Sequence, residues 1–335
     1  MSVYGGIDLG GTKIQALVLG PRNKVLGSAR MKTPTSGGPE DVAREMERAM
    51  RAAAEDAGIE VSELAGVGAG SPGVVRDGTV TSARNLPGWD GTFALADHLQ
   101  KALGVPVKIG NDVGVALEAE VRHGAGRRYA SLLGVFWGTG VGGGVAIDGE
   151  RWVGRGGAGE IGHTVVELDG ARCTCGRRGC MEAYAGRGAM EAHARKLVDR
   201  GQKTDLFKLM RKQDRDRLTS GIWARALEQG DELAEHMIER AVKAIAAAAA
   251  SAVNLLDVEA VILGGGLGVR LGDPVAKRIS KAMRPHLFAD DRPPQVEVAT
   301  LGDLGGAIGA SLLVRPQSRA RGARRAGARA GSSSA

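Results

Sequence analysis

The chain has 335 residues, 43% of them hydrophobic, which is enough for two domains or one large two-lobed unit. The net charge of +7 suggests a nucleic-acid binder, but five arginines lie in segment 316–335, and without them the charge is +2. Nucleic acid is therefore not an expected partner, and 316–335 is predicted to be a disordered basic tail. Three cysteines, no export signal and no apolar run of membrane-spanning length predict a cytoplasmic protein without a membrane partner.

The hydrophobic pattern predicts strands that alternate with helices, which is typical of an α/β fold. The 53 glycines mark tight turns and places where the backbone approaches a ligand closely. The expected strands are 3–9, 14–19, 64–69, 105–109, 131–137, 143–147 and 258–263. The expected helices are 41–57, 91–103, 113–123, 231–253 and 304–314, with short helices over 186–229.

One pattern, a strand, a Gly-Thr turn and a second strand, occurs twice, as DLGGTK at 8–13 and WGTGVGGG at 137–144. The repeat predicts two related lobes. Either turn alone is an ordinary hairpin, but two of them, with a glycine triplet after strand 258–263, favour a site that grips a polyphosphate and seats an adenosine. Asp8 could hold Mg²⁺ through water, and Lys13 adds positive charge. The expected nucleotide-binding residues are Asp8, Gly10, Gly11, Thr12, Lys13, Gly138, Thr139, Gly140, Gly264, Gly265 and Gly266.

Asn111 and Asp112 stand where a predicted strand ends and a predicted helix begins. Phosphoryl transfer to an alcohol needs a base for the hydroxyl proton, and Asp112 is the candidate. Asn111 would donate or accept hydrogen bonds with a sugar. The competing interpretation is a helix N-cap, because both residue types are favoured there.

The three cysteines, Cys173, Cys175 and Cys180, follow His163 within a short segment. Cys₃His is a known structural zinc set, so we expect a closed Zn²⁺ site; the alternative is three buried apolar cysteines. Zinc would fix the positions of Glu160 and Glu182, whose carboxylates suit sugar hydroxyls. For Glu182 the alternative is an acidic residue in the first turn of a helix.

Several motifs, in this order along the chain, resemble the ROK family of bacterial sugar kinases, most of all its glucokinases: DLGGTK, SPG at 71–73, NLPGW at 85–89, ND at 111–112, GTGVGGG at 138–144, GEIGH at 159–163 and CTCGRRGC at 173–180. The resemblance covers about residues 3 to 314. It implies the actin-like ATPase fold, with a mixed sheet in each of two lobes, and ATP and sugar in the cleft between them. The expected lobes are 1–112, completed by the helix near 303–314, and 113–302, with the zinc knuckle at 163–180.

The resemblance also implies an activity: ATP-dependent phosphorylation of the 6-hydroxyl of glucose, with Asp112 as base and Mg²⁺ as cofactor. It implies a homodimer. The alternatives are a kinase for fructose or an N-acetylhexosamine, polyphosphate as the phosphate donor, and a sugar-sensing repressor. The repressor is the least expected of these, because a first strand predicted at residue 3 leaves no room for an N-terminal DNA-binding domain. The residues that match sugar-binding positions are Gly73, Asn85, Asn111, Asp112, Glu160, His163 and Glu182. For Gly73 and Asn85 the alternative is that they are ordinary turn residues.

Overall fold

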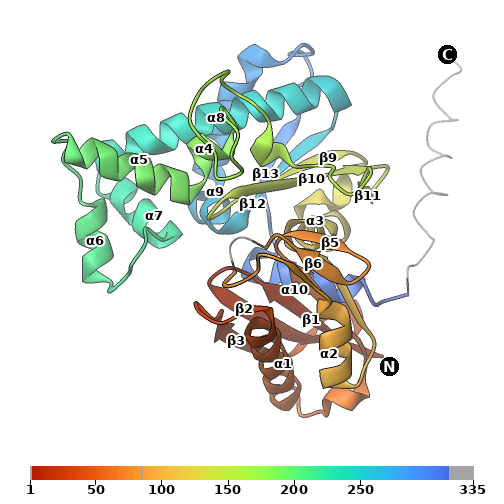
Figure 1. Ribbon diagram of the computed structural model, residues 1–335. Helices are drawn as coiled ribbons and strands as arrows, with labels where there is room; N and C mark the ends of the chain where they lie inside the picture. The colour runs from red at the N-terminus through yellow and green to blue at the C-terminus, as the bar shows by residue number, and fades with distance from the viewer. Residues whose placement is uncertain (1, 84–85, 317–335) are drawn as a thin grey trace, which may run out of the picture. The chain divides into compact units, whose positions relative to one another are not determined.

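The computed structural model describes residues 2–83 and 86–316, which form two compact units (Figure 1). The first unit comprises the chain up to Arg122 together with the segment from Asp303 onward, and the second comprises His123–Gly302. The predicted basic tail lies outside the described residues from 317 on. Within the described ranges, no helix is long and apolar enough to cross a membrane.

The first unit is built on a five-stranded mixed sheet in the order β3-β2-β1-β4-β8. β1 pairs antiparallel with β2 and parallel with β4; β2 and β3 are antiparallel, and β4 and β8 are parallel. The strands are β1 (Val3–Leu9), β2 (Lys13–Leu19), β3 (Val25–Lys32), β4 (Leu64–Ser71) and β8 (Val107–Asn111). A small antiparallel sheet consists of β5 (Val74–Arg76), β6 (Thr79–Thr81) and β7 (Thr92–Phe93).

Two helices cover opposite faces of the first sheet, because successive strand residues point to opposite sides. A Cβ on Gly5 would meet Met50 of α1 (Pro39–Asp56), whereas a Cβ on Gly6 would meet the carbonyl of Ala307 in α10 (Gly305–Leu312) at 2.0 Å. Only glycine therefore lets α10 pack this closely on β1. α2 (Leu95–Leu103) packs near β8 and α1, and α3 (Asp112–His123) leads out of β8.

The second unit repeats this sheet, in the order β11-β10-β9-β12-β13. The three strands β11, β10 and β9 are antiparallel, and β9, β12 and β13 are parallel, so order and polarity match the first unit strand for strand. The internal repeat predicted from the two Gly-Thr turns is thus present in the sheet topology. The strands are β9 (Leu132–Trp137), β10 (Val141–Ile147), β11 (Glu150–Trp152), β12 (Ala260–Gly264) and β13 (Gln295–Val298).

Helices of the second unit bury its largest apolar cluster, with α8 at its centre. α8 is capped by Asp231, whose carboxylate accepts from the amide of Ala234. The helices are α4 (Glu182–Ala185), α5 (Arg187–Asp199), α6 (Leu206–Lys212), α7 (Ser220–Glu228), α8 (Glu232–Leu256) and α9 (Gly265–Met283). Single 3₁₀ turns lie at η1 (Pro21–Asn23), η2 (Val61–Glu63), η3 (Ala125–Arg128), η4 (Ile161–His163), η5 (Arg284–His286) and η6 (Gly302–Leu304).

The α/β prediction is confirmed, and most predicted elements occur within a few residues of their expected bounds. The sequence pattern did not predict β3, the small sheet, β11, β13 or α9. α9 was missed because it opens with two glycines, contains Pro274, and breaks helical geometry at Gly272 (φ 62°).

Candidate active site

In the first unit, three strands place polar residues at one edge of the sheet. β1, β4 and β8 are parallel, and their register pairs Asp8 with Gly70 and Ser71 with Asn111. Their carboxyl ends therefore meet, and Asp112 follows directly as the first residue of α3. This edge is where ligands bind in parallel α/β sheets.

Asp8 is held against the start of α10, where a Cβ on Gly306 would lie 2.5 Å from its Cγ. Burial, and then the negative charge of Asp112, raise the pKa of Asp8 from its ordinary 3.8 to about 7, although Lys13 opposes the shift. The carboxylates of Asp8 and Asp112 are thus close enough to repel each other. A bound cation would relieve that repulsion, so Asp8 fits the expected role of holding hydrated Mg²⁺.

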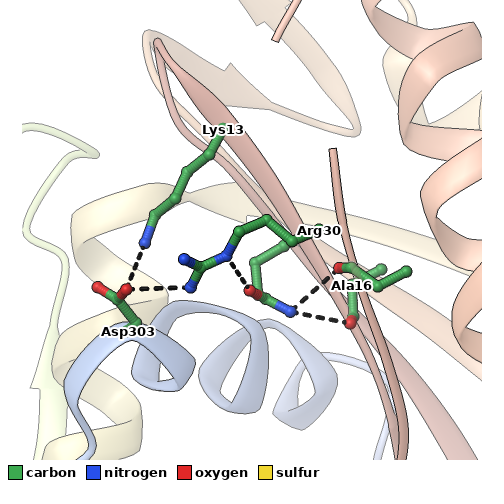
Figure 2. Close-up of polar contacts among 6 residues, drawn as sticks. Lys13, Ala16, Arg30 and Asp303 are labelled. Carbon is green, nitrogen blue, oxygen red and sulfur yellow. Dashed lines mark hydrogen bonds and ion pairs between the residues drawn. The ribbon is translucent and has the colours of Figure 1, made fainter. Parts of the chain in front are cut away.

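Lys13 at the end of the first Gly-Thr turn has a counter-ion that no sequence pattern predicts. Its Nζ lies 2.9 Å from Asp303 of η6, and Arg30 of β3 donates to the same oxygen at 3.0 Å (Figure 2). Arg30 is in turn held by the buried Gln15. The hydrogen bond from Lys13 lowers the pKa of Asp303. The ammonium group of Lys13 is therefore held by Asp303 in the 3₁₀ turn η6, which directly precedes α10.

Asn111 caps α3, because its Oδ1 accepts from the amide of Gly114 at 3.0 Å. Its Nδ2 donates to the carbonyl of Gly73 at 3.3 Å. Asn111 is thus the N-cap of α3. Asp112 is the first residue of the helix, where the helix dipole favours a carboxylate. Asn85 lies outside the described residues.

In the second unit, the Gly-Thr turn and the glycine triplet stand at the ends of neighbouring parallel strands. Gly264 of β12 is in register with Phe136 of β9, just before the turn at Gly138–Gly140. Gly138 donates to the carbonyl of Gly140 at 2.9 Å, which closes the turn. The predicted nucleotide-binding residues of this unit therefore lie together at the ends of β9 and β12, with Gly264 buried and Thr139 and Gly266 exposed.

Glu182 of α4 joins this turn to the cysteine segment. Its Oε2 accepts from the amide of Val141 at 2.9 Å, and its Oε1 accepts from the hydroxyl of Thr174 at 3.1 Å. Both carboxylate oxygens are thus engaged within the unit itself. Glu160, by contrast, is exposed, and within the described part of the chain its carboxylate has no hydrogen-bond partner.

The four expected zinc ligands converge. The ligand atoms of His163, Cys173, Cys175 and Cys180 all lie within 4.8 Å of one another. The sulfurs of Cys175 and Cys180 are 3.7 Å apart, and Nδ1 of His163 is 3.8 Å from the sulfur of Cys173. A tetrahedral zinc ion would separate two sulfurs by about 3.8 Å, whereas a disulfide would bring them to about 2 Å. The donor set therefore fits zinc and not a disulfide.

The thiols differ in how readily they ionise. Burial raises the pKa of Cys173 to about 12 and also raises that of Cys180. For Cys175 burial acts in the same direction, but hydrogen bonds from Arg177 and from the other two cysteines together outweigh it and lower the pKa to about 6. All three thiols would ionise together only with a further positive charge close to the sulfurs, and a zinc ion would supply that charge.

His163 is placed by close packing of the GEIGH loop on β10. A Cβ on Gly162 would lie 1.9 Å from the carbonyl of Val141, so only glycine fits there. The amide of His163 donates to the carbonyl of Glu160, which fixes the spacing between the predicted ligand and the free carboxylate.

Known proteins resemble this chain over nearly its whole length. The sequence profile of the ROK family matches residues 4–317. The chain belongs to the ROK family. A glucokinase of Thermotoga maritima is 32% identical, with 92% of this chain and 96% of the relative covered. An N-acetylgalactosamine kinase, AgaK, of Shewanella sp. is 31% identical, with 93% and 96% covered.

Among solved structures, a ROK family glucokinase from Streptomyces griseus in complex with glucose and AMPPNP has a TM-score of 0.80 at 31% identity, and 93% of this chain and 99% of that chain are covered. The predicted family and the predicted actin-like ATPase fold are thereby confirmed. Arg30 and Asp303, which hold Lys13, belong to none of the motifs named in the sequence analysis, so no sequence pattern pointed to them.

Proposed function

We propose that this chain is an ATP-dependent hexose kinase that phosphorylates the 6-hydroxyl of glucose, with Asp112 as the general base. Its membership of the ROK family, together with relatives named as sugar kinases at 30–32% identity, supports the coarser part, a sugar kinase. The observation that carries the mechanism is the edge of the first sheet, where Asp8, Lys13 and Asp112 come together.

Each residue has a distinct chemical task in this proposal. Asp112 accepts the proton of the attacking hydroxyl as the new P–O bond forms. Lys13 offsets charge on the phosphoryl oxygens, and Asp8 would hold Mg²⁺ through water. Asn111, already fixed as the cap of α3, and the free carboxylate of Glu160 would bind sugar hydroxyls.

Zinc is part of the proposal as a structural ion. It would be held by the four residues whose ligand atoms converge, and it would hold His163 and the start of α4 in place. With no position left for substrate on such a closed site, zinc takes no part in the phosphoryl transfer.

The sugar is less sharply defined than the reaction. Relatives of almost equal identity are named for glucose, N-acetylgalactosamine, N-acetylmannosamine and N-acetylglucosamine. Glucose is proposed first because the NLPGW and GEIGH motifs favour it. Initial rates over glucose, fructose and the three N-acetylhexosamines, each with ATP and with polyphosphate, would rank substrates and donors. Cytoplasmic location and a homodimer complete the proposal, and light scattering tests the dimer.

Asp112→Asn tests the base. We expect kcat to fall by about 10²–10⁴-fold while the Kd for glucose changes little, because the amide keeps the hydrogen-bonding shape but accepts no proton. Asp97→Asn is the matched control, since Asp97 also stands in the first turn of a helix of this unit. A kcat within tenfold of wild type for Asp112→Asn would exclude Asp112 as the base.

A further inference from the structure

Arg187, the first residue of α5, connects the two predicted nucleotide-binding turns of the second unit. One terminal nitrogen donates to the hydroxyl of Thr139 at 2.7 Å, and the other donates to the hydroxyl of Ser220 at 3.0 Å. Ser220 reaches the glycine triplet, because its Oγ lies 3.5 Å from where a Cβ on Gly266 would stand. The guanidinium therefore sits between the Gly-Thr turn and the triplet.

The charge of Arg187 has no counter-ion within the described residues. Both of its hydrogen-bond acceptors are neutral hydroxyls, and its Nε is buried with no hydrogen-bond partner among them. Burial lowers the pKa of Arg187, and Glu191 only partly opposes this. Glu191 itself is engaged, because its carboxylate accepts from Arg195 at 2.6 Å and from the amide of Leu218 at 2.8 Å.

A half-buried cation that has no counter-ion and whose Nε is buried without a partner is unfavourable in the ligand-free protein. The other cation beside a Gly-Thr turn, Lys13, is balanced by Asp303. The matching position of the second turn holds no cation. Leu9 pairs with Ile14 in the first sheet and Trp137 pairs with Val141 in the second, so the residue that matches Lys13 is Gly140. Arg187 supplies the missing charge from a different element, and the start of α5 adds its helix dipole at the same place.

We propose that Arg187 binds the phosphate chain of the nucleotide and is the counterpart, at the second turn, of Lys13 at the first. The inference rests on the proposed function, since it takes the nucleotide to be the anion. A guanidinium suits this task, because it can bond phosphate oxygens while two of its nitrogens stay on Thr139 and Ser220.

Calorimetric titration of Arg187→Gln with ADP and with adenosine separates a phosphate contact from a general effect on the turn. We expect the Kd for ADP to rise about 10–100-fold and that for adenosine to stay within twofold, because only ADP carries the charge that the guanidinium meets. Arg187→Lys should lose less ADP affinity than Arg187→Gln. Arg225→Gln is the matched control: Arg225 is an exposed cation of α7, the helix that Ser220 begins.

An ADP Kd within twofold of wild type for Arg187→Gln would overturn the inference. Equal weakening of ADP and adenosine would also overturn it, because Arg187 would then act only by shaping the turns. If wild type phosphorylates glucose with ATP while either result holds, only the role of Arg187 is wrong. If wild type binds neither ADP nor adenosine, the proposed function itself is wrong, and the inference is wrong with it.

Discussion

Glu182 offers the sharpest test of how the cysteine segment and the second Gly-Thr turn depend on each other. Its carboxylate accepts from Val141 at the end of the turn and from Thr174 between two of the cysteines. The turn also lies directly against it, because a Cβ on Gly140 would be 2.3 Å from Oε2. Glu182→Ala removes both links, whereas Glu182→Gln keeps an acceptor for Val141 and an amide group for the Thr174 hydroxyl, which can act as acceptor.

The magnitude follows from the amide of Val141. Leaving a part-buried N–H without its acceptor costs about 1–3 kcal/mol, and each kcal/mol lowers the melting temperature of a unit of this size by about 2–4 °C. Glu182→Ala should therefore lower Tm by about 2–12 °C, and Glu182→Gln by about 2 °C or less. If the carboxylate also contacts sugar, both variants should raise the KM for glucose, but only Glu182→Ala, which loosens the turn, should raise the KM for ATP.

Differential scanning calorimetry and steady-state kinetics with each substrate varied in turn would measure these effects. Thr174→Val is the control for the cysteine side, because it removes one link and leaves the Val141 hydrogen bond intact. The reasoning would be refuted by a Glu182→Ala protein whose Tm and ATP KM both equal those of wild type. A rise in ATP KM for Glu182→Gln equal to that for Glu182→Ala would show that charge, not the link, governs the turn.

Two further predictions concern metal and pH. Cys175→Ser should abolish bound zinc, measured by mass spectrometry of metals, and raise the KM for glucose severalfold, because His163 and α4 lose their common anchor; a metal-free variant with a normal KM would contradict the structural role. Asp8→Asn should raise the Tm of the nucleotide-free protein by about 10 °C at pH 8 but not at pH 4. The folded-state pKa of Asp8 is raised, so its favourable contribution is complete below 3.8 and is lost as pH rises through about 7; an equal Tm difference at both pH values would refute this.

The parts of the site that the sequence revealed are those that depend on short-range chemistry. Cys173, Cys175 and Cys180 lie within a few residues of one another, so their convergence with His163 follows from spacing and from the ligand preferences of zinc. The Gly-Thr turns are likewise local, because each joins two adjacent antiparallel strands. The α/β class followed from alternating apolar segments.

The parts that the sequence did not reveal depend on contacts between distant segments. Asp303 meets Lys13 only because α10, at the far end of the chain, packs on β1 through Gly6. Arg187 reaches Ser220 because α5 and α7 lie against the same turns. Neither Asp303 nor Arg187 belongs to a motif with a recognisable spacing of residues. In the sequence, each is therefore indistinguishable from an ordinary charged surface residue.

Because the sheet is repeated, the surroundings of its two Gly-Thr turns can be compared within one molecule. The two sheets have the same strand order and polarity, and each carries its Gly-Thr turn between equivalent strands. Near the first turn the chain places a carboxylate, Asp8, and a lysine that Asp303 balances. The second turn has Phe136 and Gly140 at the matching positions, and the positive charge there belongs to Arg187 and has no carboxylate partner in the described structure. The first turn thus resembles a site for a metal ion with phosphate, and the second a site for phosphate alone. For this reason the first turn is tested by changing the carboxylate of Asp8, and the second by changing the guanidinium of Arg187.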